Sequence, residues 1–200
     1  DLSVAAFYSK YSDFLDKSAR DGTTTITGPL GSIFGVPVIR TANVDDVNIW
    51  GLELNNVYYF NERYQGLSIG NSISYQKGEN ETEDEPLHTI QPFTIINNIS
   101  YVFPNQKLSA SLINTYVGQP TKRSDYTDYV PESYVTTDLG LGYKFSDNFS
   151  SNLGIYNLFD KTYYKWSDIN ANGGSGTDDL AYQRYAQPGR SIQAGFTWKF

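Results

Sequence analysis

Apolar and polar residues alternate one by one along several stretches of this chain, and this pattern constrains the fold more than any other feature. In the last ten residues, one apolar set consists of every second residue and alternates with polar or small residues: Ile192, Ala194, Phe196, Trp198 and Phe200. Successive side chains of a β-strand point to opposite faces of a sheet. The alternation therefore predicts strands with one apolar face and one polar face.

About eight segments are predicted to be strands on this basis, near residues 2–14, 46–60, 64–77, 92–103, 107–117, 134–145, 149–158 and 190–200. Short connections rich in Asn, Asp, Ser and Pro alternate with long ones. The long connections cover about 15–45, 78–91, 118–133 and 159–189. Such alternation of tight turns and long loops is typical of a transmembrane β-barrel.

A soluble β-sandwich also alternates apolar and polar residues, but its strands average only about five or six residues. The strands predicted here are about ten residues or longer, the length that crosses a bilayer at a tilt. Aromatic residues gather at strand ends, at 57–60, 101–103, 143–145 and 198–200. The sequence therefore favours an all-β fold, a transmembrane antiparallel β-barrel with aromatic girdles at both interfaces.

The composition excludes several other classes of protein. With a net charge of −7, the chain lacks the positive electrostatic field that nucleic-acid binding requires. The absence of cysteine excludes disulfide scaffolds and cysteine zinc modules. No apolar run approaches the roughly 18–20 residues of a membrane-spanning helix. The inward-facing residues are mostly Gly, Ser and Thr, which would fill a small barrel poorly, so we expect a wider barrel of which this chain is one part.

Several motifs resemble those of a known family. Residues 157–163 read Asn-Leu-Phe-Asp-Lys-Thr-Tyr, and the last strand runs from Gly189 to a final Trp-Lys-Phe. These two motifs resemble the C-terminal part of TonB-dependent outer-membrane receptors. Residues 6–15, 49–53 and 86–93 match the final strands of that family in the same order, so the resemblance covers essentially the whole chain. Residues 182–190 look most like receptors for haem, haemoglobin and related host iron proteins.

The resemblance implies a plugged barrel of about 22 strands in the bacterial outer membrane, to which this chain contributes about eight C-terminal strands and their extracellular loops. It implies outer-membrane lipid as the surroundings and coupling to the TonB–ExbB–ExbD complex through an N-terminal plug, with its TonB box, outside this chain. The implied function is uptake of haem or a haem-carrying protein. The alternatives are a ferric-siderophore receptor, or a self-contained eight-stranded barrel with a structural or adhesive role.

Candidate ligand-binding residues lie in the long connections. His88 is the only histidine and could ligate haem iron, as could a tyrosine phenolate. The loop aromatics that we consider are Tyr126, Tyr129, Tyr163, Tyr164, Trp166, Tyr182 and Tyr185. Packing and girdle positions are the ordinary explanation for most of them.

A possible structural calcium site begins at Asp168. Asp168, Asn170 and Asn172, followed by Gly173, match the first half of an EF-hand loop, and the twelfth position is Asp179. A flexible Gly- and Asn-rich loop is the alternative interpretation of this segment. With one histidine, no cysteine and no convergent carboxylate pair, the sequence predicts no enzyme. The family resemblance makes Phe200 an assembly signal.

Overall fold

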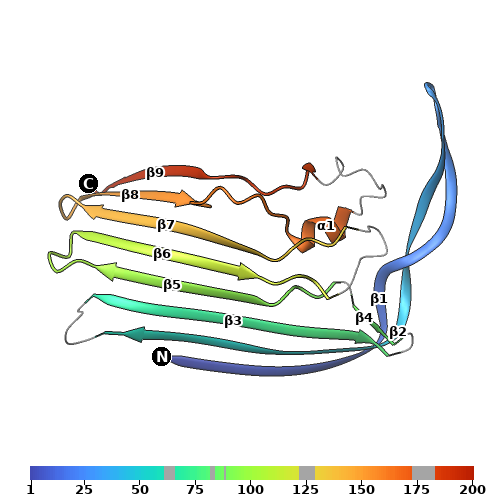
Figure 1. Ribbon diagram of the computed structural model, residues 1–200, viewed down its shortest axis with the longest axis horizontal. Coiled ribbons are helices and arrows are strands. Elements are labelled where there is room, and N and C mark those ends of the chain that lie inside the picture. Colours follow the sequence, from blue (N-terminus) through green and yellow to red (C-terminus); the bar gives the residue numbers. More distant parts are fainter. Residues whose placement is uncertain (61–65, 82–83, 88, 122–128, 173–182) are drawn as a thin grey trace.

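The described residues form one antiparallel sheet. The computed structural model describes residues 1–60, 66–81, 84–87, 89–121, 129–172 and 183–200 (Figure 1). The strands follow the order β1-β2-β3-β5-β6-β7-β8-β9, and β4 pairs with β3. The elements are β1 (Leu2–Gly28), β2 (Gly31–Tyr59), β3 (Leu67–Asn80), β4 (Glu85–Pro86), β5 (Thr94–Val102), β6 (Leu108–Val117), β7 (Tyr134–Lys144), β8 (Phe149–Tyr156), α1 (Trp166–Asn172) and β9 (Ser191–Trp198). The predicted all-β class and each of the predicted strands are confirmed.

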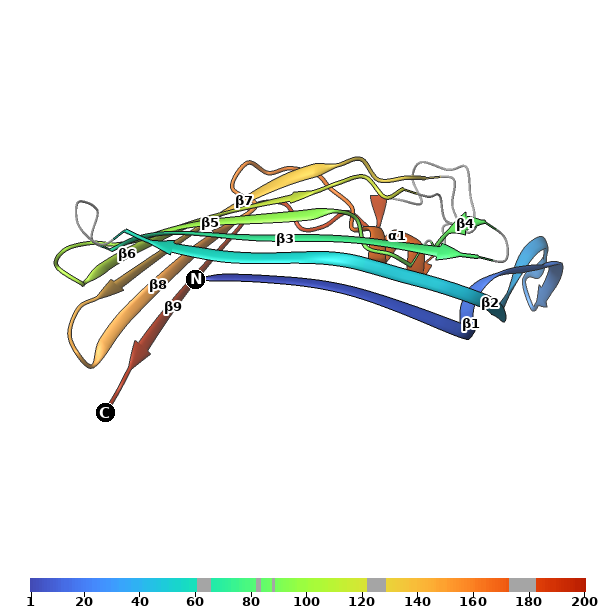
Figure 2. The same cartoon turned by 90° about the horizontal axis from the view of Figure 1, so that it is seen from below.

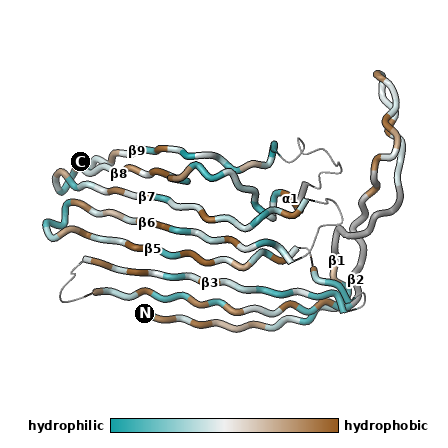
Figure 3. Tube along the Cα trace, viewed as in Figure 1, coloured by the Kyte–Doolittle hydropathy of each residue, from teal (hydrophilic) through white to brown (hydrophobic). Residues whose placement is uncertain are grey.

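The two faces of the sheet differ in chemistry, as the alternation predicts. Hydrophobic and hydrophilic residues alternate along the strands in Figure 3. Figure 2 shows that the sheet is arched. One face bears a hollow of about 360 Å³, lined among others by Ser109, Ser111, Gly140, Gly142 and Asn152. This polar face is the inner one, and the apolar side chains lie on the outer face.

On the outer face, a continuous row of apolar side chains runs across neighbouring strands. Ile69 pairs with Ile99, Ile99 with Leu112, and Leu112 with Leu139. The same level continues through Ile155 to Ile192 on the last two strands. A row of this kind suits contact with hydrocarbon, because every strand presents an aliphatic side chain on the same face.

Two aromatic girdles bound this apolar band. At the end with the long loops, ring centroids are separated by 5.5 Å for Trp50 and Tyr75, 6.3 Å for Tyr75 and Phe93, and 6.3 Å for Phe93 and Tyr116. At the end with the short turns, edge-to-face pairs recur on every second strand, at the ends of β2, β5 and β7: Tyr58–Phe60, Tyr101–Phe103 and Tyr143–Phe145. These are the positions that amphipathic rings take at the two interfaces of a bilayer.

The sheet is open, with β1 at one edge and β9 at the other (Figure 1). Backbone N–H and C=O groups along a free edge have no partner in hydrocarbon, where each unsatisfied group costs several kcal/mol. A membrane-spanning sheet therefore needs further strands at both edges, so these strands form one panel of a larger wall.

The segment 15–45 differs from the predicted long loop. β1 and β2 continue through it as a paired ribbon that ends in a two-residue turn, with Gly28 opposite Gly31. The ribbon has register shifts between Asp16 and Ala19 and again further along, and it bends away from the sheet (Figure 1). Strict alternation is missing here because a ribbon outside the bilayer has no single buried face, so the segment lacks the pattern that predicts a strand.

The long and short connections lie at opposite ends of the sheet, and both chain termini lie at the end with the short turns (Figure 1). The short helix α1 lies at the other end, within the last long connection. In the described residues, no helix has the length and hydrophobicity needed to cross a membrane.

The difference between the faces gives a first testable prediction. Leu141 lies between Ala110 and Leu153 in the register of the outer face. Replacing Leu141 by Arg should lower the free energy of unfolding of the full-length protein in lipid by about 2–4 kcal/mol. Thr136→Ser, on the inner face of the same strand, is the control and should change it little. Equal losses in urea titrations of the two variants would show that the faces are assigned wrongly.

Candidate functional site

Asn157 fastens the base of the last long connection, directly after β8. Its side chain is 5% exposed. The amide Nδ2 donates to the carbonyl oxygens of Lys161 (2.9 Å) and Pro188 (3.2 Å), and Oδ1 accepts from the Lys161 backbone N–H (2.9 Å). Because Lys161 and Pro188 lie on the outgoing and returning limbs of the loop, one amide ties both limbs together.

The backbone around Asn157 also bonds to β7. Its N–H donates to Asp138 Oδ1 at 2.7 Å, and the Leu158 N–H donates to the Thr137 carbonyl at 2.7 Å. Asn157 has a φ of 50°, in the left-handed region that Asn tolerates better than most residues. The chain can therefore turn out of β8 without losing contact with the sheet.

Asp160 holds the returning limb in a similar way. Its Oδ1 accepts a hydrogen bond of 2.7 Å from the backbone N–H of Arg190, at the start of β9. A Cβ atom at Gly189 would lie 2.6 Å from the same oxygen, so a larger residue there would displace the Asp160 carboxylate. The Asn-Leu-Phe-Asp motif is thus a structural clamp at the neck of the loop.

An aromatic cluster stands beyond this neck. Trp166 (4% exposed) and Ile169 (1%) are buried, and Tyr129, Tyr164 and Tyr185 pack against them. The rings of Tyr129 and Tyr164 meet nearly edge-on, with centroids 5.5 Å apart. Tyr129 belongs to the preceding long connection, so the cluster joins two loops that are separate in sequence.

Tyr163 pairs with Tyr134, the first residue of β7, at a centroid separation of 4.4 Å. Burial raises the pKa of the Tyr163 phenol, and the Asp138 carboxylate raises it further. At neutral pH this phenol is therefore a neutral hydrogen-bonding group. A tyrosine that ligates ferric haem acts as phenolate, and these surroundings disfavour that form.

Two hollows meet at Tyr163. The larger, of about 550 Å³, has a polar lining that includes Asp138, Tyr156, Lys165 and Gln187. The smaller, of about 200 Å³, is walled by aromatic and charged side chains, namely Tyr129, Glu132, Tyr134, Lys161 and Tyr164. Side by side they offer an aromatic surface and a set of hydrogen-bonding and charged groups, a combination that suits a ligand with a flat apolar part and polar substituents.

The structure places the predicted binding residues unevenly. Tyr129, Tyr163, Tyr164 and Tyr185 lie around the aromatic cluster and the hollows. Trp166 is buried within the cluster, so it packs the loop instead of presenting a surface. The other predicted residues, His88, Tyr126 and Tyr182, lie outside the described residues.

The segment predicted to start a calcium loop is helical. Asp168 to Asn172 belong to α1, whereas an EF-hand loop winds around its ion in a non-helical path. The Asp168 carboxylate accepts hydrogen bonds from Gln187 Nε2 (2.7 Å) and Ser167 Oγ (3.1 Å). Asp179 lies outside the described residues, and those described contain no group of three or more His, Cys, Asp or Glu residues able to hold a metal ion. The backbone here thus differs from the predicted loop, and calcium binding at these positions stays a prediction.

Sequence reasoning missed the exposed tip of the β1–β2 ribbon. Leu30, Ile33 and Phe34 are exposed there by 104%, 66% and 78%, and Ile26 by 54%. No charged residue occurs from Gly22 to Ile39. The signal that could have revealed it is this uncharged run, which an ordinary solvated loop would interrupt with charges.

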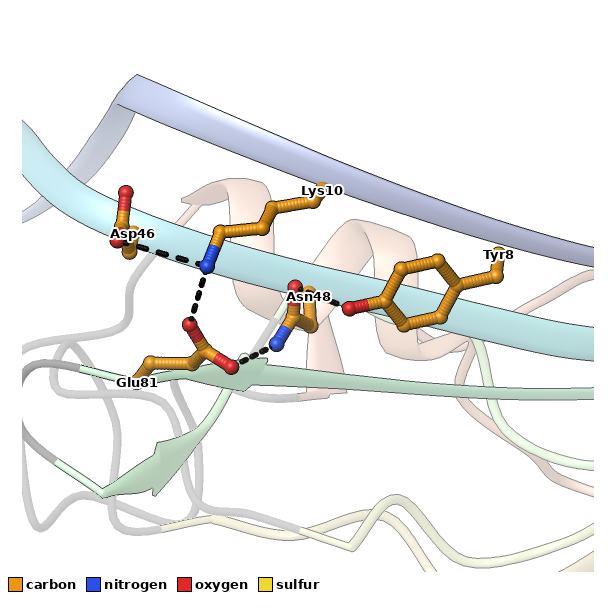
Figure 4. Close-up of polar contacts among 5 residues, drawn as sticks. All are labelled: Tyr8, Lys10, Asp46, Asn48 and Glu81. Carbon is orange, nitrogen blue, oxygen red and sulfur yellow. Dashed lines mark hydrogen bonds and ion pairs between the residues drawn. The ribbon is translucent and has the colours of Figure 1, made fainter.

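A polar cluster of Tyr8, Lys10, Asp46, Asn48 and Glu81 lies where that ribbon leaves the sheet (Figure 4). Lys10 Nζ lies 3.1 Å from Glu81 Oε2 and 3.7 Å from Asp46 Oδ2, and Asn48 Nδ2 donates to Glu81 Oε1. Tyr8 donates to Asn48 Oδ1 at 2.9 Å. These groups are half exposed, so water screens their ion pairs and each pair contributes little to stability. The cluster mainly aligns β1, β2 and β3 where the ribbon begins.

The comparison with family models decides the identity of this architecture. The TonB dependent receptor-like β-barrel model matches residues 1–158. The chain belongs to the TonB-dependent receptor family. Its strands are therefore part of a β-barrel of the outer membrane, as predicted from the sequence.

Known receptors align with almost the whole chain. It is 26% identical over 96% of its length to the probable hemoglobin and hemoglobin-haptoglobin-binding protein 4 of Haemophilus influenzae, of which it covers 22%. It is 24% identical over 85% of its length to the hemin receptor of Yersinia enterocolitica, of which it covers 25%. The chain thus spans about a quarter or less of these relatives.

Solved receptors share the fold of the panel. The copper transporter OprC superposes on all of this chain with a TM-score of 0.72 at 20% identity, and the match covers 28% of the transporter. A mutant of the ferric enterobactin receptor of Pseudomonas aeruginosa superposes with a TM-score of 0.68 at 20% identity, with 29% of that receptor covered. At this level of identity the likeness establishes the arrangement of the strands.

The neck clamp gives a second prediction. Asn157→Gly permits the same backbone conformation but removes three side-chain hydrogen bonds, so it should lower stability by about 2–3 kcal/mol and expose the loop from Phe159 to Gly189 to protease. Asn152→Gly, in the strand before the neck, is the control. Limited proteolysis of the full-length protein measures the difference. Equal cleavage of the Asn157→Gly variant and wild type would show that the amide does not hold the loop.

Proposed function

We propose that this chain is the C-terminal wall and loop portion of a receptor that takes up haem, free or delivered by a haem-carrying protein, across the outer membrane. The observation that carries the proposal is the alignment of a haemoglobin-binding protein over 96% of this chain and of a hemin receptor over 85% of it. The function is binding and gating, in which no bond is made or broken. Energy reaches the receptor from the TonB–ExbB–ExbD complex through a plug outside these residues.

The two hollows at Tyr163 suit the chemistry of haem. Its porphyrin is flat and apolar, and tyrosines supply large contact areas with few rotatable bonds. Its propionates are carboxylates, for which Lys165 in the larger hollow provides a cation. Tyr129, Tyr164 and Tyr185 frame the approach to the hollows, and Trp166 holds that frame together.

The exposed ribbon tip suits a protein partner. Leu30, Ile33 and Phe34 project beyond the membrane-spanning part of the sheet without neighbouring charges. Exposed apolar patches of this kind mark protein interaction sites. We assign to the tip the contact with the haem-carrying protein and to the hollows the contact with haem itself.

A ferric-siderophore receptor is the second candidate function. The specific observation in its favour is the 29% identity to the ferric enterobactin receptor of Pseudomonas aeruginosa over 68% of this chain, which covers 19% of that receptor. Phe200 is 115% exposed after the end of β9, and we keep for it the role of an assembly signal whichever ligand is transported.

Haem loading of the full-length receptor tests the proposed function. Purified receptor mixed with haemin should develop a shifted Soret band. Tyr163→Phe should leave the band position unchanged, because burial and the Asp138 carboxylate raise the pKa of the Tyr163 phenol and so disfavour the phenolate that would ligate iron. Failure of the wild type to bind haemin while it binds a ferric siderophore would move the assignment to the second candidate. A lost Soret shift in Tyr163→Phe would make this phenol an iron ligand.

The ribbon tip gives a separate prediction. Phe34→Ser should weaken haemoglobin capture about tenfold or more, because truncating an apolar anchor removes most of its contact area. Binding of free haemin should stay unchanged, since the tip lies away from the hollows. Thr24→Ser, another exposed position of the ribbon, is the control. Haemoglobin capture by Phe34→Ser at wild-type affinity would remove the tip from the binding surface.

A further inference from the structure

A row of polar side chains crosses the apolar outer face of the sheet. Asn56 on β2 is the register partner of Asn71 on β3, and Asn71 is the partner of Asn97 on β5. Asn97 pairs in turn with Asn114 on β6, and Asn114 with Thr137 on β7. One polar residue per strand thus lies at a single level across five neighbouring strands. We call these residues the amide row.

The members of the amide row bond to one another. Asn71 Nδ2 donates to Asn56 Oδ1 at 2.9 Å, and Asn97 Nδ2 donates to Asn71 Oδ1 at 2.7 Å. At the far end, Thr137 Oγ1 donates to Asn114 Oδ1 at 2.8 Å. Thr137 is 5% exposed, and the other members are partly buried.

The surroundings make this row unexpected. On the same face of β3, the residues two positions before and after Asn71 are Ile69 and Ile73, and on β5 the residues flanking Asn97 are Ile95 and Ile99. Polar side chains in a lipid-facing band are costly unless they are hydrogen-bonded. A surface position under no further constraint would carry an aliphatic residue here.

We propose that the amide row selects the register in which the strands of this wall pair. A slip by one residue turns the apolar side chains inward and is excluded by the alternation itself. A slip by two residues keeps every side chain on its own face, so the hydrophobic pattern alone does not exclude it. It would, however, place Asn71 opposite Ile95 or Ile99 instead of Asn97, and leave amides unpaired in hydrocarbon.

The same reasoning applies at every junction of the row. A two-residue slip sets Asn56 against Ile69 or Ile73, and Asn114 against Val135 or Leu139. Each junction thus has one register in which the polar groups meet. Since the stagger between strands fixes the tilt and diameter of a barrel, the row constrains the shape of the wall from β2 to β7.

The first test is a double-mutant cycle in the full-length receptor. Asn71→Leu leaves Asn56 and Asn97 without a partner, so it should lower the ratio of folded to unfolded protein about fivefold or more in urea titrations, although Leu is the more apolar residue. Asn71→Leu combined with Asn97→Leu should cost less than the two single effects together. Asn56→Leu with Asn114→Leu, which are not in contact, should be additive.

The second test reads the register directly and does not depend on stability. Residues 1–200 contain no cysteine, so pairs of cysteines can be introduced into them in a cysteine-free background. Ser72→Cys with Ile96→Cys reports the native register, and Ser72→Cys with Asn98→Cys reports a slip by two. In membranes, the Asn71→Leu, Asn97→Leu background should raise the yield of the slipped cross-link several-fold. The proposal is overturned if Asn71→Leu is as stable as wild type, or if only the native cross-link forms in the double variant.

Discussion

The need to pair every backbone N–H and C=O group within hydrocarbon governs this structure. It explains why antiparallel strands pair continuously from β1 to β9 and why the two edge strands require neighbours outside this panel. The left-handed residues Asn157 and Asp160 accordingly lie after the end of β8, where the chain leaves the paired sheet. Side-chain chemistry then decides which face meets lipid and which end carries the loops.

The last long loop is held in place by contacts with the sheet and with the preceding loop. Asn157 and Asp160 fix the neck of the last connection to β7 and β9, and the cluster around Trp166 and Ile169 ties it to the preceding loop. The hollows at Tyr163 are therefore held at a defined place above the inner face. In the proposed receptor this rigidity keeps the tyrosines and Lys165 oriented before the ligand arrives, which reduces the entropy lost on binding.

The sequence predicted the parts of the fold that depend on a period of two. The strands, their two faces and the girdles follow from alternation, because lipid on one side and a polar interior on the other impose it. The ribbon of residues 15–45 was missed because no such environment acts on it. The helical backbone at Asp168 was missed because a short motif carries no information about the tertiary packing of Trp166 and Ile169. The amide row could be recognised only once the pairing register of the strands was known, since a single Asn in a strand does not reveal its partner.

The assignment of the two faces is the claim on which the rest depends. Single cysteines placed in turn along residues 134–144 of the full-length receptor, labelled with a fluorophore and reconstituted with nitroxide-bearing lipids, test it directly. The structure predicts strong quenching at positions 135, 139, 141 and 143 and weak quenching at 136, 138, 140 and 142. Uniform quenching, or quenching with the opposite phase, would contradict the orientation of this wall in the membrane.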